Sequence, residues 1–358
     1  MEGCMSLQEK FNRSVVDTEL TKKYHQYAME NTKVRRRDAA DALKTSEAAL
    51  IDEQAGLQSI RLNGDIKAII EALPTLGYVM ILMRNDHAVH ERKGVYQNVK
   101  INGAMGLIIA DDRSIDLRLF LSQWKHVFAV KELVGSTERY SLQFFNGEGI
   151  AIQKIFLQPE SDLQAYESLL DLYANEDQSS PLMFVKTEHK TNLADDNDVD
   201  QAKLISDWSN ITDVHQFMGL LKRHNVSREQ AFKLVGTQYA EVFSVNKLEE
   251  TLHKIVQEAV SIMCFVGNKG GIQIHTGAIN KVVKMGDWLN VLDPEFNLHL
   301  LMPGVAHTWL IRKPSSNGII TSLELYDANG DQIAQFFGQR TEGKSENPQW
   351  RALVEAML

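Results

Sequence analysis

The stretch RYSLQFFNGEGIAIQKIF (Arg139–Phe156) returns later in the chain as ITSLELYDANGDQIAQFF (Ile320–Phe337). The two stretches lie 181 positions apart (320 minus 139), and the same offset pairs IDLRLF (115–120) with FNLHLL (296–301). A constant offset over this length indicates an internal duplication, because similarity at a fixed spacing is the sequence signature of repeated domains. We therefore predict two tandem copies of one domain.

Each copy opens with a helical segment, DIKAIIEALPTLG (65–77) in the first and NKLEETLHKIVQEAV (246–260) in the second, and strands follow. In SIDLRLFL (114–121) every second side chain is apolar, and this period of two is typical of a half-buried strand. The turn signals NGE, DANG and SSNG separate further apolar runs. Helices followed by a run of strands, twice, predict an α+β fold with antiparallel sheets rather than a doubly wound parallel sheet.

The domain boundaries follow from a change in composition. VKTEHKTNLADDNDVDQAK (185–203) is polar and acidic and has no hydrophobic period, which is typical of a linker. We predict a first repeat over 1–180, an acidic linker over 181–204 and a second repeat over 205–358. DDNDVD in this linker resembles part of an EF-hand loop. However, Gln201 stands where that loop requires glycine, which disfavours calcium binding.

The composition is that of a globular protein with ample apolar material for a core: 44% of the 358 residues are hydrophobic and 24% are charged. The net charge of −9, from 38 basic and 47 acidic residues, argues against broad nucleic-acid binding, which needs a basic surface. The first residues lack the apolar core of a signal peptide, and no run of about 18 apolar residues predicts a membrane-spanning helix. Cys4 and Cys264 form no CxxC pair, as expected in a reducing compartment. We expect a cytoplasmic protein.

The stretch TDVHQFMGLLKRHN (212–225) has the period of an amphipathic helix. One apolar stripe is expected to contain Val214, Phe217, Met218 and Leu221. Basic residues and a left-handed stop are expected at the end: Lys222, Arg223, His224 and Asn225. Thr212 or Asp213 can cap the start. His215 lies beside the stripe, and Gly219, one turn on, leaves the helix surface bare.

His215 has two interpretations: a partly buried histidine satisfied by a neighbour, or a ligand presented over a bare patch of helix to something flat. The repeat adds a comparison. TDVHQ in the second copy aligns with TKVRR in the first, which places Arg35 where His215 stands. Arg118, on the non-core face of its strand, has His299 as its counterpart. A single asymmetric site would use both His215 and Arg118, but drift after duplication explains the same differences.

Two other motifs are assigned to structure rather than chemistry. HAVHE (87–91) spaces two histidines but follows a strand, so a solvated turn is favoured over a metal site. GNKGG (267–271) lacks the spacing of a phosphate-binding loop, and a hairpin turn explains its glycines.

Several long motifs resemble the haemin-degrading factor (haemin transport, HemS/HmuS/ChuS type) family. They are WSNITDVHQFMGLLKRHNVSREQAF, IMCFVGNKGGIQI, KVVKMGDWLNVLDPEFNLHLL, RKPSSNGIITSLELYDANGDQIAQFFGQRTEG, RNDHAVHE and IDLRLFLSQWKHVFAVKE. The resemblance covers nearly the whole chain, apart from the linker and roughly the first thirty residues. It implies cytoplasmic proteins of Gram-negative bacteria that receive imported haem. It also implies a duplicated fold with large stacked antiparallel sheets and flanking helices.

The resemblance further implies the residues of a haem site. His215 stands at the position of the proximal iron ligand, and Arg118 at that of the distal arginine, which reaches across from the first half. Basic residues near the haem propionates and pocket aromatics match at Arg228, Lys313, Arg340, Phe120 and Phe265. Phe337 stands where the family often has tyrosine before GQR, so a hydroxyl that could bond a propionate is absent. His90 and His299 are fallback ligands.

The function implied first is degradation of haem b: an oxygenase-like opening of the macrocycle that releases iron, with Arg118 assisting at the distal side. The alternative is an intracellular haem carrier or store that passes haem to a separate enzyme, and a duplicated interaction domain without a ligand is a third interpretation. The chain has no dinucleotide-binding fingerprint, so we expect an external electron donor. The inner-membrane haem importer and a reductase are the expected partners.

Overall fold

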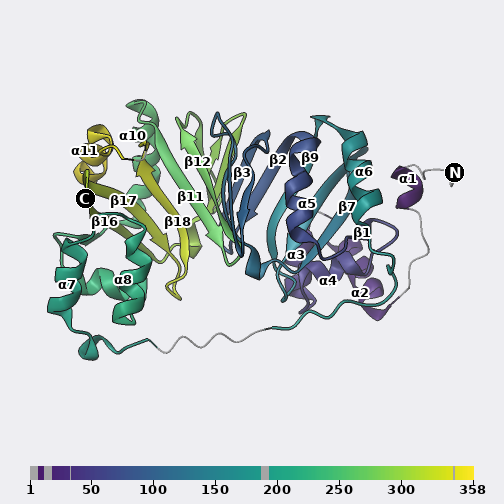
Figure 1. The fold of residues 1–358 in the computed structure, drawn as a ribbon, viewed down its shortest axis with the longest axis horizontal. Helices are drawn as coiled ribbons and strands as arrows, with labels where there is room; N and C mark the ends of the chain where they lie inside the picture. The colour runs from purple at the N-terminus through teal and green to yellow at the C-terminus, as the bar shows by residue number, and fades with distance from the viewer. Residues whose placement is uncertain (1–6, 12–17, 33, 187–192, 342) are drawn as a thin grey trace. The chain divides into compact units, whose positions relative to one another are not determined.

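The computed structural model describes residues 7–11, 18–32, 34–186, 193–341 and 343–358 (Figure 1). The chain divides into two compact units. Unit 1 comprises 1–84, 91–188 and 268–272, and unit 2 comprises 85–90, 189–267 and 273–358. The change of unit after residue 188 falls inside the predicted linker. Each unit also includes one short segment of the other repeat, 268–272 in unit 1 and 85–90 in unit 2, which was not predicted. The repeat boundaries themselves remain a prediction.

Unit 1 contains helices and a set of antiparallel strands. Its helices are α1 (Leu7–Lys10), α2 (Glu19–Glu30), α3 (Arg36–Ala42), α4 (Glu47–Asp52), α5 (Ile66–Ala72), η1 (Leu73–Leu76), η2 (Leu121–Gln123) and α6 (Leu163–Tyr173). Its strands are β1 (Ser59–Arg61), β2 (Gly77–Arg84), β4 (Lys100–Asn102), β5 (Met105–Ile109), β6 (Asp116–Phe120), β7 (His126–Val134), β8 (Thr137–Phe145) and β9 (Ala151–Ser161). Three further strands have residues in both units: β3 (Ala88–Val95), β12 (Gly271–Gly277) and β11 (Ile262–Asn268), of which only the last residue belongs to unit 1.

The strands of unit 1 run β1-β7-β8-β9-β2 in one antiparallel group and β4-β5-β6 in another. The predicted alternation in β6 is confirmed, because Leu117 and Leu119 are fully buried in the core of the unit while Arg118 and Phe120 are half-exposed. Alternate side chains of a strand point to opposite faces, so Arg118 and Phe120 share the face that the core does not use.

Unit 2 repeats this arrangement. Its helices are η3 (Asp196–Asp198), α7 (Gln201–Ser209), α8 (Gln216–His224), α9 (Arg228–Val235), η4 (Val245–Lys247), α10 (Leu248–Gln257), η5 (Met302–Gly304) and α11 (Pro348–Ala356). Its strands are β10 (Ala240–Val242), β11 (Ile262–Asn268), β13 (Val282–Met285), β14 (Trp288–Leu292), β15 (Phe296–Leu301), β16 (His307–Ser315), β17 (Gly318–Tyr326) and β18 (Gln332–Gly338). They run β10-β16-β17-β18-β11 and β13-β14-β15.

The matching strand orders of the two units confirm the tandem duplication and the α+β fold. In total the strands belong to two nine-stranded sheets, and the ladders inside each unit are antiparallel. The predicted turns NGE, SSNG and DANG lie between β8 and β9, β16 and β17, and β17 and β18. The predicted opening helices are α5 and α10, and the start of α5 is capped by Asp65, which accepts from the Ala68 N–H at 3.1 Å.

The two faces of the β16-β17-β18-β11 group in unit 2 differ. One face buries Cys264, Leu323 and Phe336 in a core that α10 and α11 cover. The opposite face packs Trp309 and Tyr326 against apolar side chains of α7, α8 and α9. In Figure 1, α7 and α8 lie close together beside β16. The helical layer covers β10, β16 and β17, and this decides which part of the face remains open.

One prediction about local structure was wrong for most of its residues. His87 lies in the bend before β3, but the rest of HAVHE, 88–91, belongs to that strand rather than to a solvated turn, and His90 is fully buried. The linker boundary remains a prediction, and the helix α7 begins inside the predicted linker, at Gln201. The Asp200 side chain caps this helix by accepting from the backbone N–H of Lys203 at 3.0 Å. An aspartate at this position is a common helix start, so the acidic stretch contributes a cap as well as a connection.

The helices of the described residues are too short or too polar for any of them to cross a bilayer.

Candidate functional site

The helix α8 begins at the residue after His215 and ends at Asn225, which adopts the predicted left-handed conformation with φ of 53°. Its buried side chains are Phe217, Leu220 and Leu221. The predicted apolar stripe was therefore wrong at one position: Met218 is 59% exposed, and Leu220 is buried instead. The helix is rotated from the predicted phase, and this rotation places Met218 on the same exposed side as His215.

His215 is exposed and is held by a neighbouring carboxylate. Its side chain is 80% exposed, and its Nδ1 lies 2.6 Å from Oδ1 of Asp213. The backbone N–H of His215 donates to the same oxygen at 2.8 Å. These bonds place the ring proton on Nδ1 and leave Nε2, among the described residues, without a hydrogen-bond partner. A neutral imidazole in this tautomer is a metal ligand through Nε2.

Hydrogen bonds from His215 stabilise the negative charge of Asp213. The backbone N–H of His215 is the main cause that holds the pKa of Asp213 below its usual value, and the imidazole hydrogen bond adds to it. The positive charge of Arg340 is a smaller cause that also lowers this pKa. Asp213 and His215 therefore form one polar group at the start of α8.

A bare strip of helix surface follows His215. Residues three and four positions apart lie on the same side of a helix, so Met218 and Gly219 neighbour His215 on the exposed side. A side-chain carbon built on Gly219 would meet one atom within 4 Å, Nη1 of Arg223 at 3.7 Å. The strip has room for a flat molecule close to the helix backbone.

An aromatic surface lies on the open part of the β11 and β18 face. Phe265 and Phe337 are half-exposed, and their ring centres lie 5.0 Å apart at an angle of 62°. They alternate with the buried Cys264 and Phe336, so they point away from that core. Met263, opposite Phe337 in the ladder, is half-exposed as well. The face that α7, α8 and α9 leave uncovered is thus apolar and aromatic.

Glu324 forms a buried polar centre beneath α8. Its carboxylate is fully buried and accepts from Nζ of Lys313 at 2.6 Å, while Nη1 of Arg228 lies 3.6 Å away. Three uncharged donors complete its shell: Ser322 at 2.9 Å, Tyr326 at 2.7 Å and Gln332 at 3.1 Å. Burial raises the pKa of Glu324, but the two cations and the hydrogen bonds outweigh burial and hold it at about 2. Burial lowers the pKa of Lys313, whose charge has this single carboxylate as its acceptor.

The three basic residues predicted near the propionates occupy different environments. Lys313 is buried, and its Nζ lies 4.5 Å from the ring centre of Phe217, so it supports α8 from below. Arg228 is one-quarter exposed and also reaches Sδ of Met218 with its Nη2 at 3.4 Å. Arg340 is half-exposed. Arg228 and Arg340 are thus partly exposed, whereas Lys313 is enclosed by Glu324 and Phe217.

The equivalent face of unit 1 is filled by its own side chains. Arg35 precedes α3 as His215 precedes α8, in agreement with the alignment of the two copies. Arg139 lies over the ring of Phe156 with 4.5 Å between its guanidinium carbon and the ring centre, and Phe156 is buried. In unit 2 the corresponding aromatic residue, Phe337, is half-exposed. The two copies thus differ in the exposure of an equivalent aromatic side chain, a difference that was not predicted.

Arg118 is engaged in an ion pair within unit 1. Its Nη1 donates to the buried carboxylate of Asp116, which also accepts from Nη1 of Arg113 at 3.0 Å. The Arg118 side chain is 34% exposed, and Phe120 on the same face is half-exposed. The pair gives Arg118 a structural role in this conformation, and its role as a distal arginine remains a prediction.

The two fallback histidines bond to neighbours inside the protein. Nδ1 of the buried His90 lies 2.9 Å from Nε2 of Gln273, and Nδ1 of His299 lies 2.6 Å from Oδ1 of Asn290. His215 is far more exposed than either, which favours it as the ligand.

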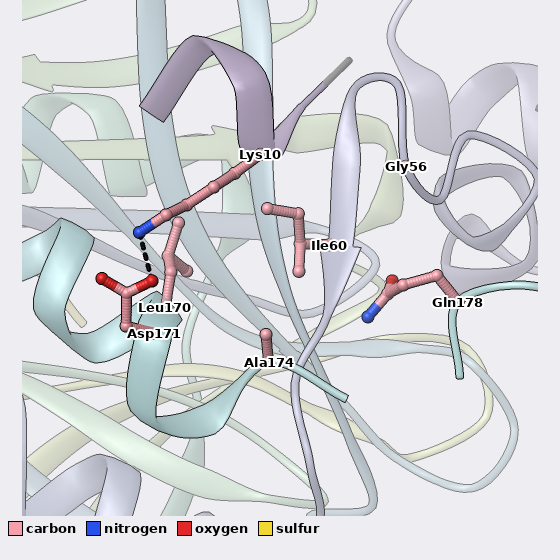
Figure 2. Close-up of a pocket in the computed structure, with 7 residues that line it drawn as sticks. All are labelled: Lys10, Gly56, Ile60, Leu170, Asp171, Ala174 and Gln178. Atoms are coloured by element: carbon pink, nitrogen blue, oxygen red, sulfur yellow. Dashed lines mark ion pairs between the residues drawn. The ribbon is translucent and has the colours of Figure 1, made fainter. Parts of the chain in front are cut away.

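A small pocket in unit 1 was not predicted. It has a volume of about 180 Å³ and is lined by Lys10, Gly56, Ile60, Leu170, Asp171, Ala174 and Gln178 (Figure 2). Inside it, Nζ of Lys10 pairs with Asp171 at 2.5 Å. Pockets for drug-sized ligands measure about 300–1,000 Å³, so this one is too small for a tetrapyrrole. The two charged residues are far apart in sequence, and no local pattern could have indicated the pocket.

Sequence reasoning missed three residues of the candidate site. Asp213 was considered as a helix cap, although its spacing from His215 also allows a hydrogen bond to the imidazole. Glu324 is the one charged residue in the apolar strand SLELY, and that isolation is a signal for a buried, paired carboxylate. Met218 was assigned to the core.

Comparison with known proteins places the chain in a family. A family model described as the haemin-degrading HemS.ChuX domain matches residues 44–173 and 225–357, one match in each repeat. The hemin transport protein HmuS of Yersinia pestis is 40% identical over 347 residues, which covers 96% of this chain and 98% of that protein. The hemin transport protein HemS of Yersinia enterocolitica is 41% identical over 332 residues, covering 92% and 94%.

Solved structures agree. The holo form of PhuS, a heme-binding protein from Pseudomonas aeruginosa, superposes with a TM-score of 0.91 at 40% identity, covering 94% of this chain and 98% of that one. The heme degrading enzyme ChuS of Escherichia coli O157:H7 superposes with a TM-score of 0.88 at 39% identity, with the same coverage. With both repeats matched and about 40% identity over nearly the full length, this chain belongs to the haemin-degrading HemS/ChuX family.

Proposed function

We propose that the protein binds one haem b on unit 2, with His215 as the iron ligand, and opens the macrocycle to release the iron. The observation that carries this proposal is the His215 imidazole itself: it is exposed, held by Asp213 at 2.6 Å, and set beside the bare surface of Gly219. The relatives support it, because one is a heme-binding protein and another a heme degrading enzyme.

The surroundings of His215 suit haem. A neutral imidazole is a common axial ligand of haem iron. The half-exposed rings of Phe265 and Phe337 offer an apolar surface to the macrocycle. Arg228 and Arg340 are cations that can pair with the two propionates, which need charge-assisted hydrogen bonds in a protein of net charge −9.

One experiment separates degradation from simple binding. The protein is loaded with haem without oxygen, reduced, and then exposed to air. Loss of the Soret band together with free iron and an open tetrapyrrole supports degradation. A stable ferrous-oxygen spectrum contradicts degradation and supports the carrier.

The second candidate function is that of a haem carrier, which one observation favours. Arg118, the residue expected to assist oxygen chemistry, is paired with the buried Asp116. The names of the Yersinia relatives also refer to transport. A carrier needs the His215 site alone, and transfer of haem to a separate degrading enzyme would be its measurable activity.

Replacing Arg118 by alanine distinguishes the two functions. If Arg118 serves the oxygen chemistry, the variant should bind haem with the affinity of the parent and lose haem to air at least tenfold more slowly. If the residue is structural, haem loss should be unchanged. Asp116 would then lose one of its two arginine partners, at a cost of about 1–3 kcal/mol in unfolding free energy. Arg118→Lys, which keeps the charge for Asp116, is the matched control.

Replacing Arg340 by alanine should weaken haem binding by about 1–3 kcal/mol, the range for a hydrogen bond between charged groups. The axial-ligand spectrum should be nearly unchanged, because His215 keeps its place. Haem titration followed by absorbance measures both. Lys233→Ala, which removes an exposed cation from α9, controls for the general loss of positive charge. A spectral change without a loss of affinity would contradict the propionate role of Arg340.

The remaining expectations accompany this proposal. Degradation consumes electrons, so an external donor and a reductase are required, and the inner-membrane haem importer is the expected source of haem. A cytoplasmic location fits these partners. Cell fractionation and cross-linking in haem-fed cells test the location and the partners together.

A further inference from the structure

We propose that Asp213 is a positioning residue for His215: its carboxylate fixes the imidazole and makes Nε2 a strong, electron-rich iron ligand. The proposal rests on the proposed role of His215 as that ligand. Its basis is geometric, because one oxygen of Asp213 accepts from both the ring Nδ1, at 2.6 Å, and the backbone N–H, at 2.8 Å, of the same residue. Two bonds to one oxygen define the ring orientation better than either bond alone.

Hydrogen bonds also hold the shape of the segment that contains Asp213 and His215. The side-chain oxygen of Gln216 accepts from the backbone N–H of Thr212 at 3.1 Å, and its amide donates to the Thr212 hydroxyl at 3.2 Å. The backbone N–H of Gln216 donates to the carbonyl of Asp213 at 2.9 Å. The tight loop from 212 to 216 is thereby fixed before any ligand binds.

The carboxylate of Asp213 is used for the histidine rather than for the helix. An aspartate just before a helix commonly accepts from the free N–H groups of the first turn. Here the position before α8 is His215 itself, which makes no capping bond with its side chain, and Oδ1 of Asp213 bonds to His215 instead. The first turn of α8 therefore has no side-chain cap, and the carboxylate of Asp213 orients the His215 ring instead.

A carboxylate that is hydrogen-bonded to Nδ1 of a histidine changes the chemistry of its Nε2. Metal-binding histidines donate their second N–H to a carboxylate or carbonyl, which fixes the tautomer and raises the basicity of the ligating nitrogen. If haem iron binds at Nε2, the more basic imidazole would stabilise the ferric over the ferrous form. Asp213 is 55% exposed, so a haem that covers this surface and excludes water would strengthen the bond.

The test is Asp213→Asn in the full-length, haem-loaded protein. The amide has nearly the same shape but lacks the charge. We expect the iron–histidine stretching band of the ferrous form to move to lower frequency in resonance Raman spectra, and the ferric/ferrous midpoint potential to rise. Asp213→Glu, which restores a carboxylate, should recover part of both shifts.

Asp207→Asn is the matched control. Asp207 also pairs with a histidine of unit 2, Nε2 of His224 at 2.9 Å, but that ring is almost fully buried and is not part of the site. Its replacement should leave the stretching band and the potential at the values of the parent protein. Thermal unfolding of both variants shows whether the fold is retained.

The outcomes separate this inference from the proposed function. If His215→Ala leaves the axial spectrum unchanged, His215 is not the ligand, and both proposals fail. If His215→Ala changes the spectrum while Asp213→Asn leaves the band and the potential unmoved, the inference alone is overturned. A loss of affinity in Asp213→Asn without either shift would also overturn it, because it would show a purely structural cap.

Discussion

Replacing His215 by alanine is expected to remove the histidine-ligated haem spectrum and to weaken haem binding by about 100-fold or more, roughly 3 kcal/mol. The bond from Nε2 to iron is the strongest single contact available on this surface, and loss of even an outer partner of a metal ligand costs about 10–100-fold. Absorbance titration with ferric haem measures the affinity and the ligand together. Imidazole added to the variant should restore part of the spectrum, because the surface around Gly219 stays open.

His253→Ala is the matched control for this variant. His253 is an exposed histidine of α10 in the same unit, so its loss removes an imidazole without touching α8. Its affinity and spectrum should equal those of the parent. If the parent spectrum survives in His215→Ala but changes in variants of His90 or His299, one of these two is the ligand, and the site must lie elsewhere.

The duplication and the fold class were predictable because their signals are local or periodic. The offset of 181 positions relates stretches of similar sequence directly, and the alternation of buried Leu117 and Leu119 with Arg118 repeats every two residues. Most of HAVHE was predicted wrongly because its signal was also local. Its place directly after a strand suggested a solvated turn, whereas β3 buries His90, because tertiary packing overrides the polarity of a short segment.

The candidate site was predictable only in part. His215 could be singled out because it has no counterpart in the first copy, but the phase of α8 was misjudged. Phe217 and Leu221 are compatible with a stripe through Met218 or through Leu220, which lie about 160° apart around a helix, since each residue turns by about 100°. Packing beneath the helix decides between them. The sequence of an isolated helix does not contain that information.

The pairing of Lys313 with Glu324 depends on the sheet rather than on sequence distance. Lys313 faces Ile320 in the β16–β17 ladder, while Glu324 faces Trp309, four residue pairs away. Because four is an even number, the two side chains lie on the same face of the sheet. The resemblance to the haemin-degrading family implied that Lys313 lies near the haem propionates. The register of the two strands turns the ammonium towards a buried carboxylate, and only the folded structure shows this.

Replacing Lys313 by alanine is therefore expected to act on the fold, lowering the unfolding free energy at pH 7 by about 3–5 kcal/mol, the cost of leaving one partner of a buried ion pair alone. Arg228, 3.6 Å from Glu324, compensates in part and favours the lower end of this range. Chemical denaturation measures the loss. The double variant Lys313→Met/Glu324→Gln removes both charges and should recover most of it, which a simple loss of packing at Lys313 would not allow.

Acid titration of the Lys313→Ala variant gives a second, independent test of the ion pair between Lys313 and Glu324. In the parent the pKa of Glu324 is about 2, below its usual 4.5, so its charge contributes stability above about pH 4.5 that is lost as the pH falls towards 2. Without Lys313 the folded-state pKa of Glu324 rises towards or above its unfolded value, and this contribution shrinks or changes sign. The stability difference between parent and Lys313→Ala should therefore narrow steadily from pH 5 to pH 2. A difference that stays constant over this range would show that Lys313 contributes packing against Phe217 rather than its charge.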